Sequence, residues 1–284
     1  MEGENPWESL VDHYIHGRSF DKRNTYTRYW HGYLIFVKPL LYLTDYRTIR
    51  LLNGICQMLS AGYVCYLLGR ERLKGFIVPY VLSYFMLMPV ALAMNLEFSS
   101  CYYIFNFGSA ALLANRRKLT TQRAVCIFFF IGIATAYFDY LTYPIATFGI
   151  PACVYLGLLM GDSQRGRVVR LIKTGASWGA GYGSMWASKW IIGTAFTDKN
   201  VIMDALQSIS TRTSNASSDG LTQYSVKGCI EDNLFAFFRT PVSFLVLAFV
   251  LCIIVVVLIR FRKGDDIPGE RLLPYFILMV LPFC

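Results

Sequence analysis

Two acidic residues fall where apolar stretches turn, and they are the first candidates for chemistry. Asp139 lies in the middle of an apolar stretch that runs from about Ala124 to Met160, and Glu97 lies in the turn between the apolar segments 75–94 and 99–114. Carboxylates that share a pocket can act as a general base or as ligands of a divalent metal ion. The alternative is structural: Asp139 caps the returning helix, and Glu97 is an ordinary interfacial acid.

Lys189 is the basic residue that lies well inside an apolar segment, in "SMWASKWIIG". An ionisable side chain within a membrane segment is by default a functional-site hypothesis. Lys189 could pair with Asp139 or bind a lipid-linked phosphate. The alternative is a lysine whose ammonium group reaches the outer interface beside Trp186 and Trp190.

The run "TRYWHGY", residues 27–33, is the third candidate, with Arg28, Trp30 and His31 as its substrate-binding residues. Arg28 and His31 are three positions apart, so a helix would place them on one face. Arginine suits phosphate, and aromatic faces suit a sugar ring, which together would bind an anionic, sugar-bearing headgroup. The alternative is an aromatic belt at the membrane interface that includes a histidine.

The elements that must position these residues are membrane helices. Of the 284 residues, 55% are hydrophobic and 16% are charged, which is too apolar for an ordinary soluble domain. Apolar blocks of about 15–20 residues approach the length that crosses a ~30 Å hydrocarbon core. We therefore predict an all-α, polytopic integral membrane protein with about seven or eight membrane segments. The predicted segments are residues 50–69, 75–94, 99–114, 124–138, 145–160, 176–196, 242–260 and a last one from 272.

Basic residues alternate between the connections and predict the topology. The connections after residues 69, 114, 160 and 260 carry Lys and Arg, whereas those at 95–98 and 139–144 carry none. The positive-inside rule makes the basic set cytoplasmic, so residues 1–48, the turn near Asp139 and the loop 197–241 are external. We interpret the net charge of +9 as this topology signal, not as a sign of a nucleic-acid partner.

The chain divides into an external N-terminal region, 1–48, and a transmembrane domain, 49–284. Residues 34–43 are too few to span and suit an interfacial helix. The small residues Gly179, Gly181, Gly183 and Ala187 predict close helix packing in the segment 176–196.

Four stretches carry a resemblance: "RYWHGYLIFVKPLLYL", "EFSSCYYIFNFGSAALL", "TAYFDYLTYPIATFGIP" and "SWGAGYGSMWASKWIIG". They resemble a group of uncharacterised bacterial multi-spanning envelope proteins. Those proteins have an anchor before this region and further spans after it, so we expect the chain to be an internal piece of a longer protein.

More distantly, the layout is similar to the GT-C glycosyltransferases, which use polyprenyl-phosphate sugars as donors and have an acidic residue in an outward site. For the acidic motif of their first external loop, this chain offers only Asp12 and Asp21.

The resemblance implies a membrane glycosyltransferase that moves a sugar from a polyprenyl-phosphate donor to a cell-envelope glycan or lipid on the outer face. In that hypothesis Asp139 or Glu97 is the base or a metal ligand, and a divalent metal ion is the cofactor to consider. Arg28 and Lys189 hold phosphate, and Trp30 stacks on the sugar. Two alternatives stay open: a transporter or flippase of lipid-linked sugars, and a non-catalytic envelope assembly protein.

Overall fold

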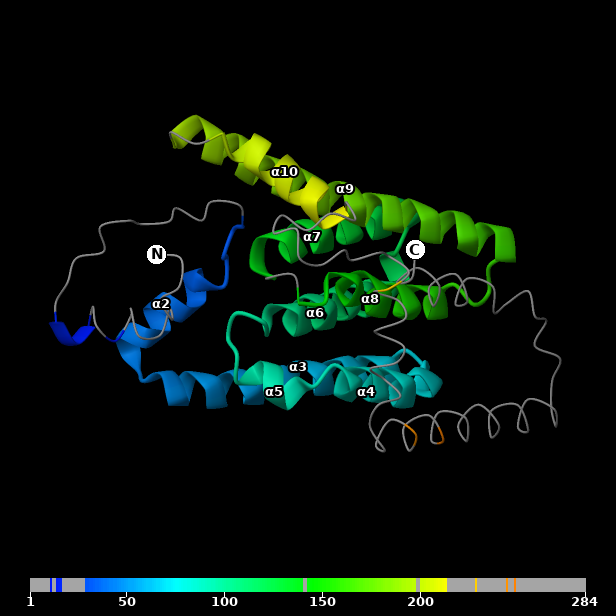
Figure 1. The fold of residues 1–284 in the computed structure, drawn as a ribbon. Helices are drawn as coiled ribbons and strands as arrows, with labels where there is room; N and C mark the ends of the chain where they lie inside the picture. Colours follow the sequence, from blue (N-terminus) through cyan, green and yellow to red (C-terminus); the bar gives the residue numbers. More distant parts are fainter. Residues whose placement is uncertain are drawn as a thin grey trace.

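The fold is helical throughout the part of the chain that the computed structural model describes (Figure 1). The described residues are 29–139, 142–197 and 200–213, with residues 11, 14–16, 228, 244 and 248. The elements, in chain order, are α2 (Leu34–Leu43), α3 (Tyr46–Arg70), η1 (Lys74–Phe76), α4 (Ile77–Met86), α5 (Pro89–Ala93), α6 (Ser100–Ala114), η2 (Arg116–Lys118), α7 (Thr121–Phe138), α8 (Pro144–Leu158), α9 (Gln164–Phe196) and α10 (Val201–Thr213).

The predicted all-α class is confirmed for these residues. The predicted segments 242–260 and from 272 lie outside them, apart from isolated positions.

Helices α3, α6, α7, α8 and α9 form a bundle in which α7 packs along α9 and α6 packs against both α3 and α8. One cluster of the core joins α3, α4 and α6 around Leu68, Tyr84 and Tyr102. The other joins α7 and α8 around Phe128 and Tyr155. The bundle positions the candidate residues because the chain leaves α7 and enters α8 at the same end where α9 finishes (Figure 1).

Two glycines set the distance between α7 and α9. A Cβ at Gly132 would lie 2.1 Å from the Trp178 carbonyl oxygen, and one at Gly181 would lie 2.1 Å from the Phe129 carbonyl oxygen. No side chain fits at either position, so the two helix backbones touch directly. Such close approach through small residues is what the predicted packing surface on α9 requires.

The predicted small-residue surface is confirmed at one glycine. Gly181 packs against α7, whereas a Cβ at Gly179 or at Gly183 would meet nothing within 4 Å among the described residues. Residues two positions apart point to different sides of a helix, so the three glycines cannot share one contact.

The predicted segment 75–94 is helical but interrupted, because the chain there forms the two short helices α4 and α5. Met88 separates them and has φ 57°, in the left-handed region. Pro89 follows at the first position of α5. A proline cannot donate the helix hydrogen bond and disfavours helical geometry in the residue before it, so the helix ends here.

Two predicted loops contain helix. The basic connection 161–173 is helical from Gln164, because α9 runs for 33 residues from there. Its start is capped by Ser163, whose Oγ accepts a hydrogen bond from the Gly166 amide at 3.3 Å. In the predicted external loop 197–241, residues Val201–Thr213 form α10.

Two of the described helices, α3 and α7, are long and apolar enough to cross a membrane. The apolar helix α8 has 15 residues, a rise of about 22 Å that falls short of a ~30 Å core. Helix α2 matches the predicted bounds 34–43, and its 10 residues rise about 15 Å.

Basic connections gather at one end of the bundle. Arg116 of η2 lies beside Glu71, which follows α3, with its Nη1 atom 3.5 Å from the Glu71 carboxylate. The turn that leads into α9 is held by an ion pair of 3.1 Å between Arg170 and Asp162. The candidate acids and Lys189 lie toward the opposite end.

Candidate functional site

The segment of residues 29–33 docks on the end of α7. The Gly32 amide donates a hydrogen bond to the Tyr137 carbonyl at 2.9 Å. A Cβ at position 32 would lie 2.5 Å from the same carbonyl oxygen, so glycine is needed for this approach. The Trp30 ring lies 5.3 Å from the Tyr137 ring between centroids, and α2 continues the contact by stacking Phe36 on Phe138 at 5.8 Å.

The same segment reaches α9, where Trp30 and Lys189 meet. The Trp30 indole N–H donates to the Met185 carbonyl at 2.8 Å. The Lys189 ammonium lies 4.7 Å from the centroid of the Trp30 ring, a cation–π contact. Tyr29 adds an edge contact to Trp186 at 5.1 Å. Residues 29–33 thus bridge α7 and α9 and hold the lysine in place.

His31 is in the left-handed region, with φ 49°, and this turns the chain toward α2. The predicted helix that would place Arg28 and His31 on one face is therefore wrong at His31, because α2 begins at Leu34. Arg28 itself lies outside the described residues. A residue held in this uncommon backbone region is costly and is found more often at functional sites.

Charges from two other elements act on His31. Burial lowers the pKa of the imidazole from its ordinary 6.5, the positive charge of Lys189 lowers it further, and the negative charge of Glu97 raises it. Burial and Lys189 thus favour the neutral imidazole, and Glu97 opposes them.

Glu97 lies partly buried in the connection between α5 and α6. The turn around it is closed by the Ser99 hydroxyl, which donates to the Leu96 carbonyl at 3.0 Å. A carboxylate just before a helix N-terminus is favoured by the helix dipole, which suits its place three residues before Ser100.

Asp139 is the residue that ends α7, and 9% of its surface is exposed. Its Oδ2 atom accepts a hydrogen bond from the Thr142 amide at 3.0 Å. The residue that caps α8 is Tyr143, so the expected cap of the returning helix is wrong in position. Asp139 instead closes the turn that leads to α8, and a hydrogen bond of 2.7 Å between Thr135 and Thr147 joins the two helices beneath it.

A row of aromatic side chains on α9 was missed from the sequence. The rings of Trp178, Tyr182, Trp186 and Trp190 follow one another with centroid distances of 5.2, 6.1 and 5.5 Å. They are four positions apart, a helix-face spacing that was visible in the sequence. The row ends beside Lys189.

The structure thus brings Trp30, His31, Lys189 and Glu97 to one end of the bundle, with Asp139 in the adjoining turn. Among the described residues, no three His, Cys, Asp or Glu side chains lie close enough together to hold a metal ion. The expected divalent metal ion therefore has no ligand set in this part of the chain.

Comparisons of the chain with protein-family models, with curated proteins and with solved structures give no match.

Proposed function

We propose that this chain is a membrane glycosyltransferase that moves a sugar from a polyprenyl-phosphate donor to an envelope glycan or lipid on the outer face. Helices α3 and α7 supply the membrane crossings. The basic end of the bundle is cytoplasmic by the positive-inside rule. The end that carries Lys189, His31 and Glu97 then faces outward.

One observation carries the proposal: a fixed ammonium group, an imidazole and a carboxylate share one end of the bundle. Lys189 is held over Trp30 at 4.7 Å, and both Lys189 and Glu97 act on His31. Glycosyl transfer from a phosphate donor needs a base for the acceptor hydroxyl and a positive charge near the departing phosphate. Glu97 and Lys189 provide these two groups.

In the proposed step, Glu97 takes the proton of an acceptor hydroxyl while its oxygen forms a bond to the anomeric carbon. The bond between that carbon and the phosphate oxygen breaks, and polyprenyl phosphate leaves with the electron pair. Lys189, joined by Arg28 in this proposal, stabilises the phosphate charge. The aromatic row on α9 offers ring faces to the sugar or the prenyl chain, and Trp30 anchors the lysine.

We assign the base role to Glu97 and a positioning role to Asp139. Asp139 Oδ2 is engaged with the Thr142 amide, and that hydrogen bond fixes the turn before α8. An asparagine side chain accepts the same hydrogen bond without the charge, which makes the two assignments separable.

The test compares Glu97→Gln with Asp139→Asn in the full chain, purified and placed in lipid nanodiscs with a polyprenyl-phosphate sugar. We expect Glu97→Gln to lower the transfer rate about 10²–10⁴-fold, the usual loss on removing a general base. Asp139→Asn should change the rate less than about tenfold. Full activity of Glu97→Gln with an inactive Asp139→Asn would move the base to Asp139. Full activity of both variants would overturn the proposal.

A further inference from the structure

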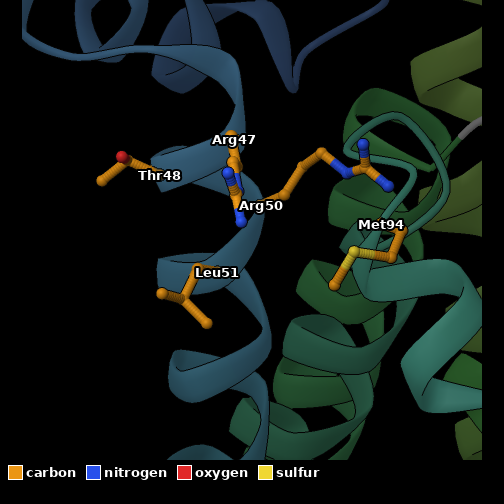
Figure 2. Close-up of a pocket in the computed structure, with 5 residues that line it drawn as sticks. All are labelled: Arg47, Thr48, Arg50, Leu51 and Met94. Atoms are coloured by element: carbon orange, nitrogen blue, oxygen red, sulfur yellow. The ribbon is translucent and has the colours of Figure 1, made fainter.

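A groove along α3 has a charged part and an apolar part, and none of the candidate-site residues lines it. The charged part is a cavity of about 570 Å³ lined by Arg47, Thr48, Arg50, Leu51 and Met94 (Figure 2). Leu51 and Met94 also line a second cavity, of about 400 Å³, which continues along α3 between α4 and α5. Together the two cavities have the size of a ligand pocket.

The groove exists because of two local features. The break at Met88 ends α4 and starts α5 at Pro89, so that Tyr84 of α4 and Pro89 of α5 both line the groove beside α3. Gly54 lines the groove on α3, and a Cβ there would meet the Ala93 Cβ at an ordinary 3.7 Å. A longer side chain at position 54 would fill the groove, whereas alanine would fit.

The charged part has two arginines and no acid among its five lining residues. No salt bridge within the described residues involves Arg47 or Arg50. Asp45, two residues before Arg47, is engaged with Thr48, whose amide and hydroxyl donate to it at 2.9 and 2.8 Å. Two guanidinium groups beside an apolar wall favour a phosphate group, which arginine can bind through two parallel hydrogen bonds.

The apolar part contains a buried amide that has no hydrogen-bond partner. Gln57 is 1% exposed, and neither its Nε2 nor its Oε1 atom is hydrogen-bonded. The Tyr84 hydroxyl, in the same wall, is also buried without a partner. An unmade hydrogen bond of this kind costs about 1–3 kcal/mol, so both groups favour a ligand with a polar group at this depth.

We propose that the groove binds an anionic diacyl phospholipid of the surrounding membrane. The inference rests on the membrane location proposed above, but not on glycosyl transfer. Arg47 and Arg50 hold the phosphate, Gln57 and Tyr84 donate to an ester carbonyl, and an acyl chain lies over Gly54. Gln57 is seven residues beyond Arg50, a rise of about 10 Å along α3. The long, flexible arginine side chain can span part of this distance to reach the phosphate.

The test is titration of the full chain in non-ionic detergent with short-chain phosphatidylglycerol and, separately, with phosphatidylcholine of the same chain length. Binding is followed by calorimetry. We expect phosphatidylglycerol to bind more tightly, and the double variant R47Q/R50Q to weaken its binding at least about tenfold, since it removes two charge-assisted contacts. The matched control is R117Q/R165Q, which removes two exposed arginines at the other end of the bundle and should change the affinity less than about twofold.

Two further variants test the apolar part. Gly54→Leu should weaken binding at least about tenfold by filling the groove, whereas Gly54→Ala should change it less than about twofold. Gln57→Leu should weaken binding and also raise the unfolding temperature of the lipid-free protein, because it removes an unpaired buried amide. If Gln57 served only to stabilise the fold, Gln57→Leu would lower the unfolding temperature and would not weaken lipid binding selectively.

Equal binding of the two lipids, or unchanged phosphatidylglycerol binding by R47Q/R50Q, would overturn the proposal. Binding of polyprenyl phosphate that is tighter than phosphatidylglycerol and unchanged by Gln57→Leu would overturn the choice of a diacyl lipid. Glu97→Gln should leave lipid binding unchanged, so failure of the glycosyl-transfer proposal and failure of this one are separate results.

Discussion

At the scale of single residues, His31 is the clearest reporter of the candidate site. The positive charge of Lys189 and the negative charge of Glu97 both act on it and move its pKa in opposite directions. Its backbone conformation, with φ 49°, fixes the imidazole at the point where the chain turns from its contacts with α7 and α9 into α2. The pKa of His31, measured by titration, therefore reports the charges of both Lys189 and Glu97.

We predict pKa changes of opposite sign in two variants. Lys189→Met should raise the pKa of His31 toward 6.5, because it removes a charge that disfavours the imidazolium form. Glu97→Gln should lower the pKa further, because it removes a charge that favours that form. The chain has three histidines, so NMR titration of their ring protons can resolve His31. Shifts of the same sign would contradict this arrangement of charges.

At the scale of elements, the contact between α7 and α9 holds both sides of the candidate site. Gly132 and Gly181 let the backbones touch, and residues 29–33 then bridge the two helices beyond that contact. The site geometry therefore depends on two glycines that lie away from it.

We predict that alanine at two nearby glycines has opposite effects on stability. Gly181→Ala should destabilise the protein by about 1–3 kcal/mol, because its Cβ would collide with the α7 backbone. Gly183→Ala should stabilise it by up to about 1 kcal/mol, because alanine favours the helix and no described residue lies within 4 Å of its Cβ. Denaturant unfolding in detergent measures both, and equal effects would contradict the contact.

The sequence predicted some of these elements well and others poorly. The expected segments 99–114, 124–138 and 145–160 match α6, α7 and α8 to within a few residues. Long apolar runs bounded by polar residues predict both the helix and its approximate ends. The charges of residues 164–173 hid the first turns of α9, since a solvated helix and a loop have similar composition. The end of α4 at Met88 was signalled by Pro89, but the apolar run on both sides concealed it.

The candidate site was only partly predictable. Asp139, Lys189, Trp30 and His31 stand out because polar and aromatic residues interrupt apolar runs. The contact of Trp30 with the Met185 carbonyl joins residues 155 positions apart, and no local pattern specifies it. The groove between α3 and α5 was missed because it depends on a helix break and on a glycine whose neighbours come from another helix.

At the scale of the whole molecule, the two ends of the bundle carry different sets of charged residues. Arg116 and Glu71 meet at one end, together with the basic start of α9. Glu97, Asp139 and Lys189 lie toward the other. A protein with this distribution has a defined orientation in a membrane if its long apolar helices cross it.

We predict that the basic end is cytoplasmic and that the 95–98 turn is external. Single cysteines replacing Asn95 and Arg117, both exposed, in a cysteine-free background should react differently with an impermeant maleimide added to intact cells. Asn95→Cys should be labelled, and Arg117→Cys should be labelled only after the membrane is opened. Labelling of Arg117→Cys in intact cells would reverse the topology.

The docking of residues 29–33 also has a consequence for the order of synthesis. Trp30 leaves the ribosome long before its partner carbonyl on Met185, 155 residues later in the chain. At typical rates of about 5–20 residues per second, that interval is roughly 10–30 s. Until Tyr137 is made the segment lacks both of its supports, and until α9 is made it lacks one of them. The site is therefore completed only after α7 and α9 have been made, although residues 29–33 leave the ribosome well before both helices.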